Sequence, residues 1–161
     1  MGIRYYASPV LAADVEIAQA DPRAFMCCQR AAERQDALDY PPRSLYLDKC
    51  WRQLQDLLGP KGDQPARPSF QLVEGQVTNT SRGWDSFRKV LSPEQVLDVA
   101  RDLALIGEQE VLAARVREFG GTGVINDDPD ELRYVMQYLD DAKAFVAELA
   151  EENLGLIYTI G

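Results

Sequence analysis

The sequence predicts a single α+β domain over residues 1–161, and three observations lead to this prediction. The chain has 161 residues, 46% of them hydrophobic, which is the size at which one domain can bury a substantial core. Runs rich in aromatic and β-branched residues, typical of strands, occur near the N-terminus, in the middle and at the C-terminus. Between them, apolar residues recur at helical spacing in about five or six segments.

The N-terminal elements are indicated by a strand-like run followed by helix start signals. The run IRYYASPVL has strand character, and Pro9 is expected to close it. A helix should follow, because Ser8 suits the N-cap and Pro9 the first helical position, with Asp21-Pro22 at its far end. A second helix is expected over residues 22–35, and a polar break over residues 36–44.

The segment LDKCWRQLQDLL, residues 47–58, predicts a core helix. Its apolar residues recur at helical spacing, and Gly59-Pro60 should end the helix. Ser44 or Asp48 is expected to cap the helix, and Asp48 can pair with Arg52 four residues later. Trp51 should therefore face the core, and the acid, base and thiol before it are better explained as the start of a core helix than as a reactive cluster.

The second half of the chain predicts a long loop followed by regular elements. Residues 59–83 are rich in Pro, Gly, Gln, Ser and Thr, with a short strand or helical turn expected at SFQLVEG. WDSFRKVL predicts a strand that leads into a helix, for which Ser92, Pro93 and Gln95 supply a capping box. The remaining expected elements are helices over residues 108–119 and 130–152 and a terminal strand over residues 156–160.

The charge of the chain disfavours nucleic acid and anionic membranes as partners. The net charge is −9, and residues 126–153 hold nine acids against two bases. Nucleic-acid binding draws on clustered Lys and Arg, so this balance has the wrong sign. The acidic helix is either a solvated face or a docking surface for a basic protein, with Asp140, Asp141 and Glu148 as its accessible residues.

The sequence contains no histidine and three cysteines. The lack of histidine excludes Ser-His and Cys-His nucleophile pairs, His-ligated zinc and histidine general bases. Cys27 and Cys28 are adjacent, and adjacent cysteines seldom bridge each other, so reduced thiols and a cytoplasmic location are expected. No metal, cofactor or catalytic residue is therefore assigned.

Two loop motifs are explained without a ligand. GGTG at residues 120–123 lacks the Lys-Ser/Thr of a phosphate-binding loop, and acids follow it. INDDPDE at residues 125–131 lacks the glycine and terminal glutamate of a calcium-binding loop, so it predicts an N-capping loop before a helix.

A polar site, if present, is expected among a few residues near the start of the Trp51 helix. The candidates for the polar site are the tyrosines Tyr5 and Tyr6 with Asp48, Lys49, Arg88 and Lys89, and the expected contacts for a ligand or partner are Tyr6, Asp48, Lys49, Trp51 and Arg88. Arg88 can hold a carboxylate bidentately, and the alternative for it is a structural ion pair.

Four blocks of the sequence together resemble the YfbM-like family, a bacterial group of small proteins of unassigned function. They are MGIRYYASPV, LDKCWRQLQDLL, RKVLSPEQV and AKAFVAELAEENLGLIYTIG, in that order. The resemblance implies one α+β domain with N-terminal, central and C-terminal strands in a small mixed sheet, and it implies no activity, cofactor or catalytic residue. Arg52 stands where such proteins often have histidine.

Three functions remain open at this stage. The first is a non-catalytic binding or regulatory protein, including an immunity-type protein, which small size and acidity permit. The second is a histidine-independent enzyme that uses carboxylates or a thiol. The third is a small-ligand-binding domain with its site between the sheet and the Trp51 helix.

Overall fold

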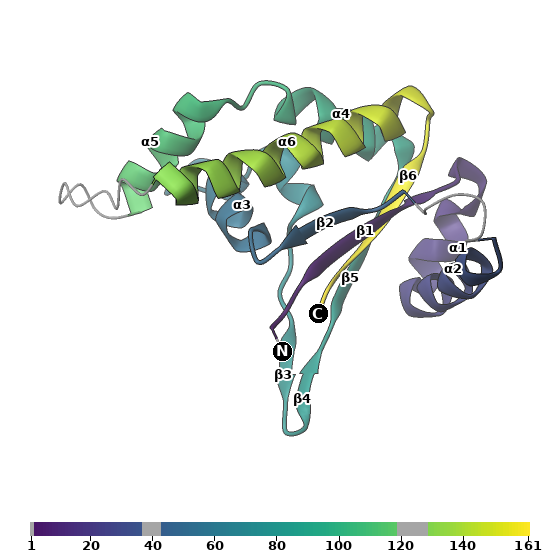
Figure 1. Cartoon of the computed structure of the whole chain (residues 1–161). Helices are drawn as coiled ribbons and strands as arrows, with labels where there is room; N and C mark the ends of the chain where they lie inside the picture. Colours follow the sequence, from purple (N-terminus) through teal and green to yellow (C-terminus); the bar gives the residue numbers. More distant parts are fainter. Residues whose placement is uncertain (1, 37–42, 119–128) are drawn as a thin grey trace.

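The computed structural model describes residues 2–36, 43–118 and 129–161, and its centre is a four-stranded sheet (Figure 1). The strands lie in the order β2 (Leu45–Asp48), β1 (Tyr5–Val10), β6 (Gly155–Ile160) and β5 (Phe87–Leu91). Each neighbouring pair is antiparallel. A separate two-stranded ribbon projects beyond the sheet and consists of β3 (Thr78–Thr80) and β4 (Gly83–Asp85).

Helices cover the two faces of the four-stranded sheet unequally (Figure 1). The larger group consists of α3 (Trp51–Leu58), the 3-10 turn η2 (Pro68–Leu72), α4 (Pro93–Leu103), α5 (Glu108–Glu118) and α6 (Pro129–Glu151). The smaller group consists of the 3-10 turn η1 (Ala12–Asp14), α1 (Val15–Ala20) and α2 (Pro22–Asp36), on the other side of the sheet.

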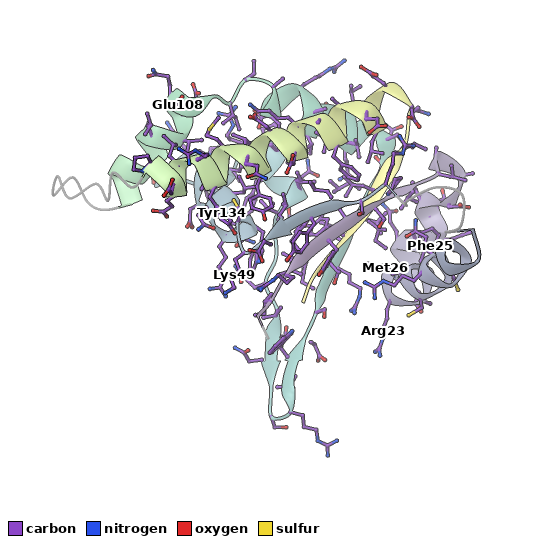
Figure 2. The ribbon with its side chains drawn as sticks, in the orientation of Figure 1. Arg23, Phe25, Met26, Lys49, Glu108 and Tyr134 are labelled. Carbon is purple, nitrogen blue, oxygen red and sulfur yellow. The ribbon has the colours of Figure 1, made fainter. Side chains whose placement is uncertain are left out.

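Alternation along β6 divides the apolar side chains between two cores, because successive side chains of a strand point to opposite faces. Leu156, Tyr158 and Ile160 belong to the main core under α3, α4 and α6. Ile157 points the other way, into a small core under α1 and α2. The other buried members of the small core are Val10, Val15, Ala18, Met26 and Val90. Figure 2 shows Met26 and Phe25 on α2 beside the sheet.

The predicted helix after β5 is confirmed together with its capping box. The Ser92 hydroxyl accepts from the Gln95 backbone N–H at 3.4 Å, and the Gln95 side chain accepts from the Ser92 N–H at 2.9 Å. Pro93 occupies the first turn. The helix presents Val96, Val99 and Leu103 to the main core, as the apolar spacing predicts.

The α+β class is confirmed, but the sheet is antiparallel throughout the described strands and not mixed. The helix expected to begin at Ser8 is also wrong. Ser8 and Pro9 lie inside β1, which pairs with β6 over six residues up to Val10, and α1 begins only at Val15. Pairing in the sheet therefore overrides a local helix start signal.

The start of the Trp51 helix differs from the prediction. Leu45–Asp48 is the strand β2, which pairs with β1, and α3 begins at Trp51. Neither Ser44 nor Asp48 caps the helix, because Cys50 occupies the N-cap position without a side-chain hydrogen bond. The end at Gly59 is confirmed. The GGTG motif and most of the INDDPDE loop fall on residues 119–128, which lie outside the described residues.

Candidate functional site

Asp48 is the residue on which most polar contacts of the expected site converge. It ends β2 with a backbone φ of 46°, in the left-handed region that Asp tolerates better than most residues. Its Oδ1 pairs with Nε of Arg4 at 2.7 Å and accepts a hydrogen bond from the Tyr46 hydroxyl at 3.1 Å. The Tyr134 hydroxyl, on α6, donates to Oδ2 at 3.1 Å. Asp48 therefore ties the N-terminal segment, β2 and α6 together, and the expected pair with Arg52 is replaced by Arg4.

The contacts of Asp48 keep its carboxylate charged. Desolvation opposes the charged form, but the hydrogen bonds from Tyr46 and Tyr134 and the charge of Arg4 outweigh it and lower the pKa of Asp48. Desolvation and the hydrogen bond to Asp48 raise the pKa of Tyr134 to about 12. Tyr134 therefore stays protonated at neutral pH and remains a donor to Asp48.

The three residues after Asp48 do not form a reactive cluster with it. Cys50 is fully buried, and desolvation followed by the charge of Asp48 raises the pKa of its thiol to about 12. Trp51 is 1% exposed in the main core, as predicted, and the Arg52 guanidinium lies 5.3 Å from its ring centroid. Lys49 is exposed, and Figure 2 shows it directed away from the sheet. The thiol, the base and the acid thus have different surroundings.

A row of side chains crosses the sheet on the face that carries α1 and α2, in the part that these helices do not cover. We call this row the open face, and it consists of Tyr46, Tyr6, Thr159 and Arg88. Its two tyrosines are exposed, Arg88 is half-buried and Thr159 between them is buried. They stand directly opposite one another on β2, β1, β6 and β5, so they share one side of the sheet. The rings of Tyr6 and Tyr46 pack with centroids 5.0 Å apart, and these residues are 43% and 40% exposed.

Arg88 is the charged end of the open face. It is half-buried, and its guanidinium donates one hydrogen bond, to the Ser86 carbonyl oxygen at 3.3 Å. Among the described residues it has no ion pair, so the alternative of a structural ion pair is not supported for this arginine. Its neighbour Lys89 points to the opposite side of the sheet and pairs with Glu74 at 2.8 Å.

The acidic residues predicted to be accessible lie on the exposed side of α6, which packs over the opposite side of the sheet from the open face. We call Asp140, Asp141 and Glu148 the acidic face, and all three are exposed. Its charge is partly compensated, because Glu148 accepts from Nη1 of Arg43 at 2.8 Å. Lys143 lies 3.6 Å from Asp140. Asp141 has no ion pair within the described ranges.

A groove of about 1210 Å³ lies beside the polar side of α3. Its walls come from α3, η2, the loop over residues 59–64 and parts of α5 and α6, through residues such as Arg52, Asp56, Phe70 and Val111. Trp51 does not line it. The groove therefore does not occupy the place expected for a small ligand, between the sheet and the Trp51 helix.

The structure gathers only part of the predicted site. Tyr6 and Arg88 share the open face, Asp48 and Lys49 lie at the end of β2, and Trp51 is in the core. Three partners of Asp48 are not predicted from the sequence, namely Arg4, Tyr46 and Tyr134. The alternation Leu45-Tyr46-Leu47 is a signal that identifies Tyr46 as the outward residue of a strand, since both leucines are buried.

Neither a membrane-spanning helix nor a cluster of metal-ligating residues occurs in the described ranges. No helix there combines the length and apolar character needed to cross a membrane. The same ranges contain no group of three or more His, Cys, Asp or Glu residues placed to hold a metal ion.

Comparison with known proteins identifies the family. No curated protein matches the chain. The chain is similar in structure to a solved protein described as "a Protein of Unknown Function YfbM from Escherichia coli", with a TM-score of 0.56 and 13% identity over 99% of this chain and 100% of that chain. At this identity the similarity shows a common fold. The family described as "Domain of unknown function (DUF1877)" matches residues 1–159. The chain therefore belongs to the DUF1877 family and is a YfbM-like domain.

Proposed function

We propose that this protein is a non-catalytic binding protein that holds a protein partner on its open face. The observation that carries this proposal is the exposed pair of Tyr6 and Tyr46 in one row with Arg88. Tyr and Arg are the residue types that, with Trp, contribute most to binding energy at protein interfaces. The two packed rings also supply contact area at a small cost in conformational entropy, because a tyrosine side chain has only two χ angles to fix.

The chemistry around Asp48 supports binding over catalysis. A thiol with a pKa of about 12 is almost entirely protonated at neutral pH, which disfavours Cys50 as a nucleophile. A general acid or base acts best with a pKa near the working pH, and the pKa of Asp48 is shifted down, away from that range. Both groups are better explained as parts of the structure that hold β2 and α3 in place.

The acidic face of α6 is a second candidate surface for the same function, with a basic protein as its partner. Its support is the position of Asp140 and Asp141 on an exposed helix side in a chain of net charge −9. A regulatory or immunity-type role is the form of the proposal in which the bound partner is itself an active protein.

Selection from a random peptide library tests the proposal. Independent binders of the wild-type protein should converge on the open face, so most should lose binding to the double variant Tyr6→Ala/Tyr46→Ala. The control variant is Leu105→Ala, which removes a side chain of a residue that is 72% exposed and lies between α4 and α5. Binders that tolerate the double variant as well as the control would contradict the proposal, provided that circular dichroism shows the variants to be folded.

A further inference from the structure

We infer that the segment held on the open face is acidic, with one of its carboxylates on the guanidinium of Arg88 and an apolar or aromatic side chain on the Tyr6–Tyr46 pair. This inference rests on the proposed function and adds the chemistry of the partner. It uses one side of the sheet only, so it is separate from the acidic face of α6.

The guanidinium of Arg88, unpaired among the described residues, favours a carboxylate on the partner. This preference rests on Arg88 and not on the net charge of this side, because η1 and α1 also carry Asp14, Glu16 and Asp21 there. Arg88 makes no ion pair with a described residue, and Arg23, exposed on α2, makes none either. Figure 2 shows Arg23 extending from α2 toward the end of the molecule that carries β3 and β4. Arg4 differs from both, because Asp48 already neutralises it. Of these three arginines, Arg88 is therefore the one that lies in the open face with its guanidinium free of a carboxylate from the described residues.

The form of Arg88 points to a carboxylate. A guanidinium presents a planar fork of N–H donors that matches the two oxygens of a carboxylate. One of its donors is used by the Ser86 carbonyl oxygen, which leaves the rest of the fork for a partner. A basic segment would place like charges against Arg88 and Arg23, which lowers both affinity and association rate.

The register of the sheet sets the spacing of the partner's side chains. Arg88 is two strands away from Tyr6 and three away from Tyr46. Neighbouring strands are about 4.8 Å apart, so the two tyrosines lie roughly 10 and 15 Å from Arg88 at the backbone. Side chains at positions i and i+4 of an extended peptide point the same way and are about 13 Å apart. An acidic residue four positions from an aromatic or large apolar residue therefore fits Arg88 at one end and the tyrosine pair at the other.

The test selects random extended peptides, each about twelve residues long and so able to span the whole row. Parallel selections use the wild-type protein, Arg88→Gln and Tyr6→Ala/Tyr46→Ala. Peptides from the wild-type selection should be enriched in Asp or Glu four positions from an aromatic or large apolar residue. That enrichment should disappear in the Arg88→Gln selection.

The contribution of the Arg88 guanidinium is then measured with one selected synthetic peptide, whose binding is monitored by fluorescence anisotropy. Arg88→Gln should weaken binding about tenfold or more, and Arg88→Lys should restore part of it, because lysine keeps the charge without the bidentate geometry. Arg101→Gln is the matched control, since Arg101 is exposed on α4 on the other side of the sheet and should have no effect. Raising the salt from about 50 to about 300 mM should weaken the wild-type complex more than the Arg88→Gln complex.

The outcomes separate the two proposals. Peptides that depend on Tyr6 and Tyr46 but show no acidic preference, and bind Arg88→Gln as well as wild type, would overturn the inference and leave the proposed function standing. If no peptide depends on the two tyrosines, both fail. Concentration-dependent self-association that is abolished by Arg88→Gln would overturn the extended peptide as the occupant, because the carboxylate on Arg88 would then come from the helix α6 of a second copy.

Discussion

Replacement of Asp48 tests whether this carboxylate holds the N-terminal segment, β2 and α6 together. Three substitutions separate its contributions. Asp48→Asn keeps a residue that tolerates the left-handed region but removes the charge. Asp48→Ala removes the polar contacts and retains a Cβ at a φ of 46°, and Asp48→Gly removes the contacts and relieves the backbone strain.

The structure gives the size of each effect. A hydrogen bond to a charged group contributes about 1.5–3 kcal/mol, and the lower end applies here because the Asp48 side chain is 28% exposed. Asp48→Ala loses the bonds from Tyr46 and Tyr134 and the partly exposed pair with Arg4, and it adds about 1–2 kcal/mol of left-handed strain, so we expect a loss of about 4–5 kcal/mol. Asp48→Asn should cost about 1–2 kcal/mol, and Asp48→Gly should recover roughly 1 kcal/mol relative to Asp48→Ala.

Urea unfolding followed by far-UV circular dichroism measures these differences, and its pH dependence gives an independent check. The pKa of Asp48 is lowered from its ordinary value of 3.8, so its contribution is fully present above that pH and is lost as the pH falls through the lower folded value. The difference between wild type and Asp48→Asn should therefore be constant from about pH 5 to 8 and shrink below about pH 4. A loss under about 0.5 kcal/mol for Asp48→Ala, or Asp48→Gly no better than Asp48→Ala, would refute the reasoning.

Other predictions test the core, the thiols and the acidic face. Trp51→Ala should cost about 3–5 kcal/mol in chemical denaturation, and Trp51→Phe less, because the indole N–H has no hydrogen-bond partner to lose; a cost under about 1 kcal/mol for Trp51→Ala would move the residue out of the core. In the native protein, mass spectrometry after alkylation should find Cys27 and Cys28 modified and Cys50 protected, whereas modification of Cys50 would contradict its burial. Chelators and reductants should leave the melting temperature unchanged, and a stoichiometric metal in the purified protein would contradict this expectation. If a basic protein binds the acidic face, its association should slow when added salt shortens the Debye length to about 8 Å, and also when Asp140, Asp141 and Glu148 are replaced by lysine. An association rate that is indifferent to both changes would mean that these residues only face solvent.

The sequence predicted most of the fold where local signals and tertiary structure agree. The capping box at Ser92 and the long periodic run that became α6 are local, and both helices form as expected. The failures occur where strand pairing decides. Ser8-Pro9 is a helix start signal in isolation, but β1 pairs with β6, a strand almost at the other end of the chain, over six residue pairs, and this pairing holds it extended. Leu45–Asp48 is only four residues long, too short for its alternation to stand out beside the helical spacing that follows.

The candidate site was less predictable, because it depends on which strands become neighbours. Arg88 and Tyr6 are far apart in the sequence, and their common row exists only through the order β2-β1-β6-β5. The burial of Trp51 could be predicted from helical spacing alone. The pair of Asp48 with Arg4 could not, because it depends on the irregular register between Tyr5 and Tyr6 and on the left-handed backbone of Asp48.

The helices α1 and α2 cover only part of their side of the sheet, and the residues in the covered and uncovered parts differ in kind. In the neighbouring row on the same side of the sheet, closer to α1 and α2, Val90 and Ile157 are apolar and are buried in the small core. In the uncovered row the chain places two tyrosines and an arginine, whereas a strand face that only meets water is well served by short polar or charged residues. Rings that are about 40% exposed still present much of their apolar area to solvent, and a partner that covers them gains that burial. Arg88 stands at the end of the same row with most of its N–H donors unused. A partner that covers the two rings and also supplies a carboxylate would therefore bury the exposed apolar area and pair the guanidinium at the same time.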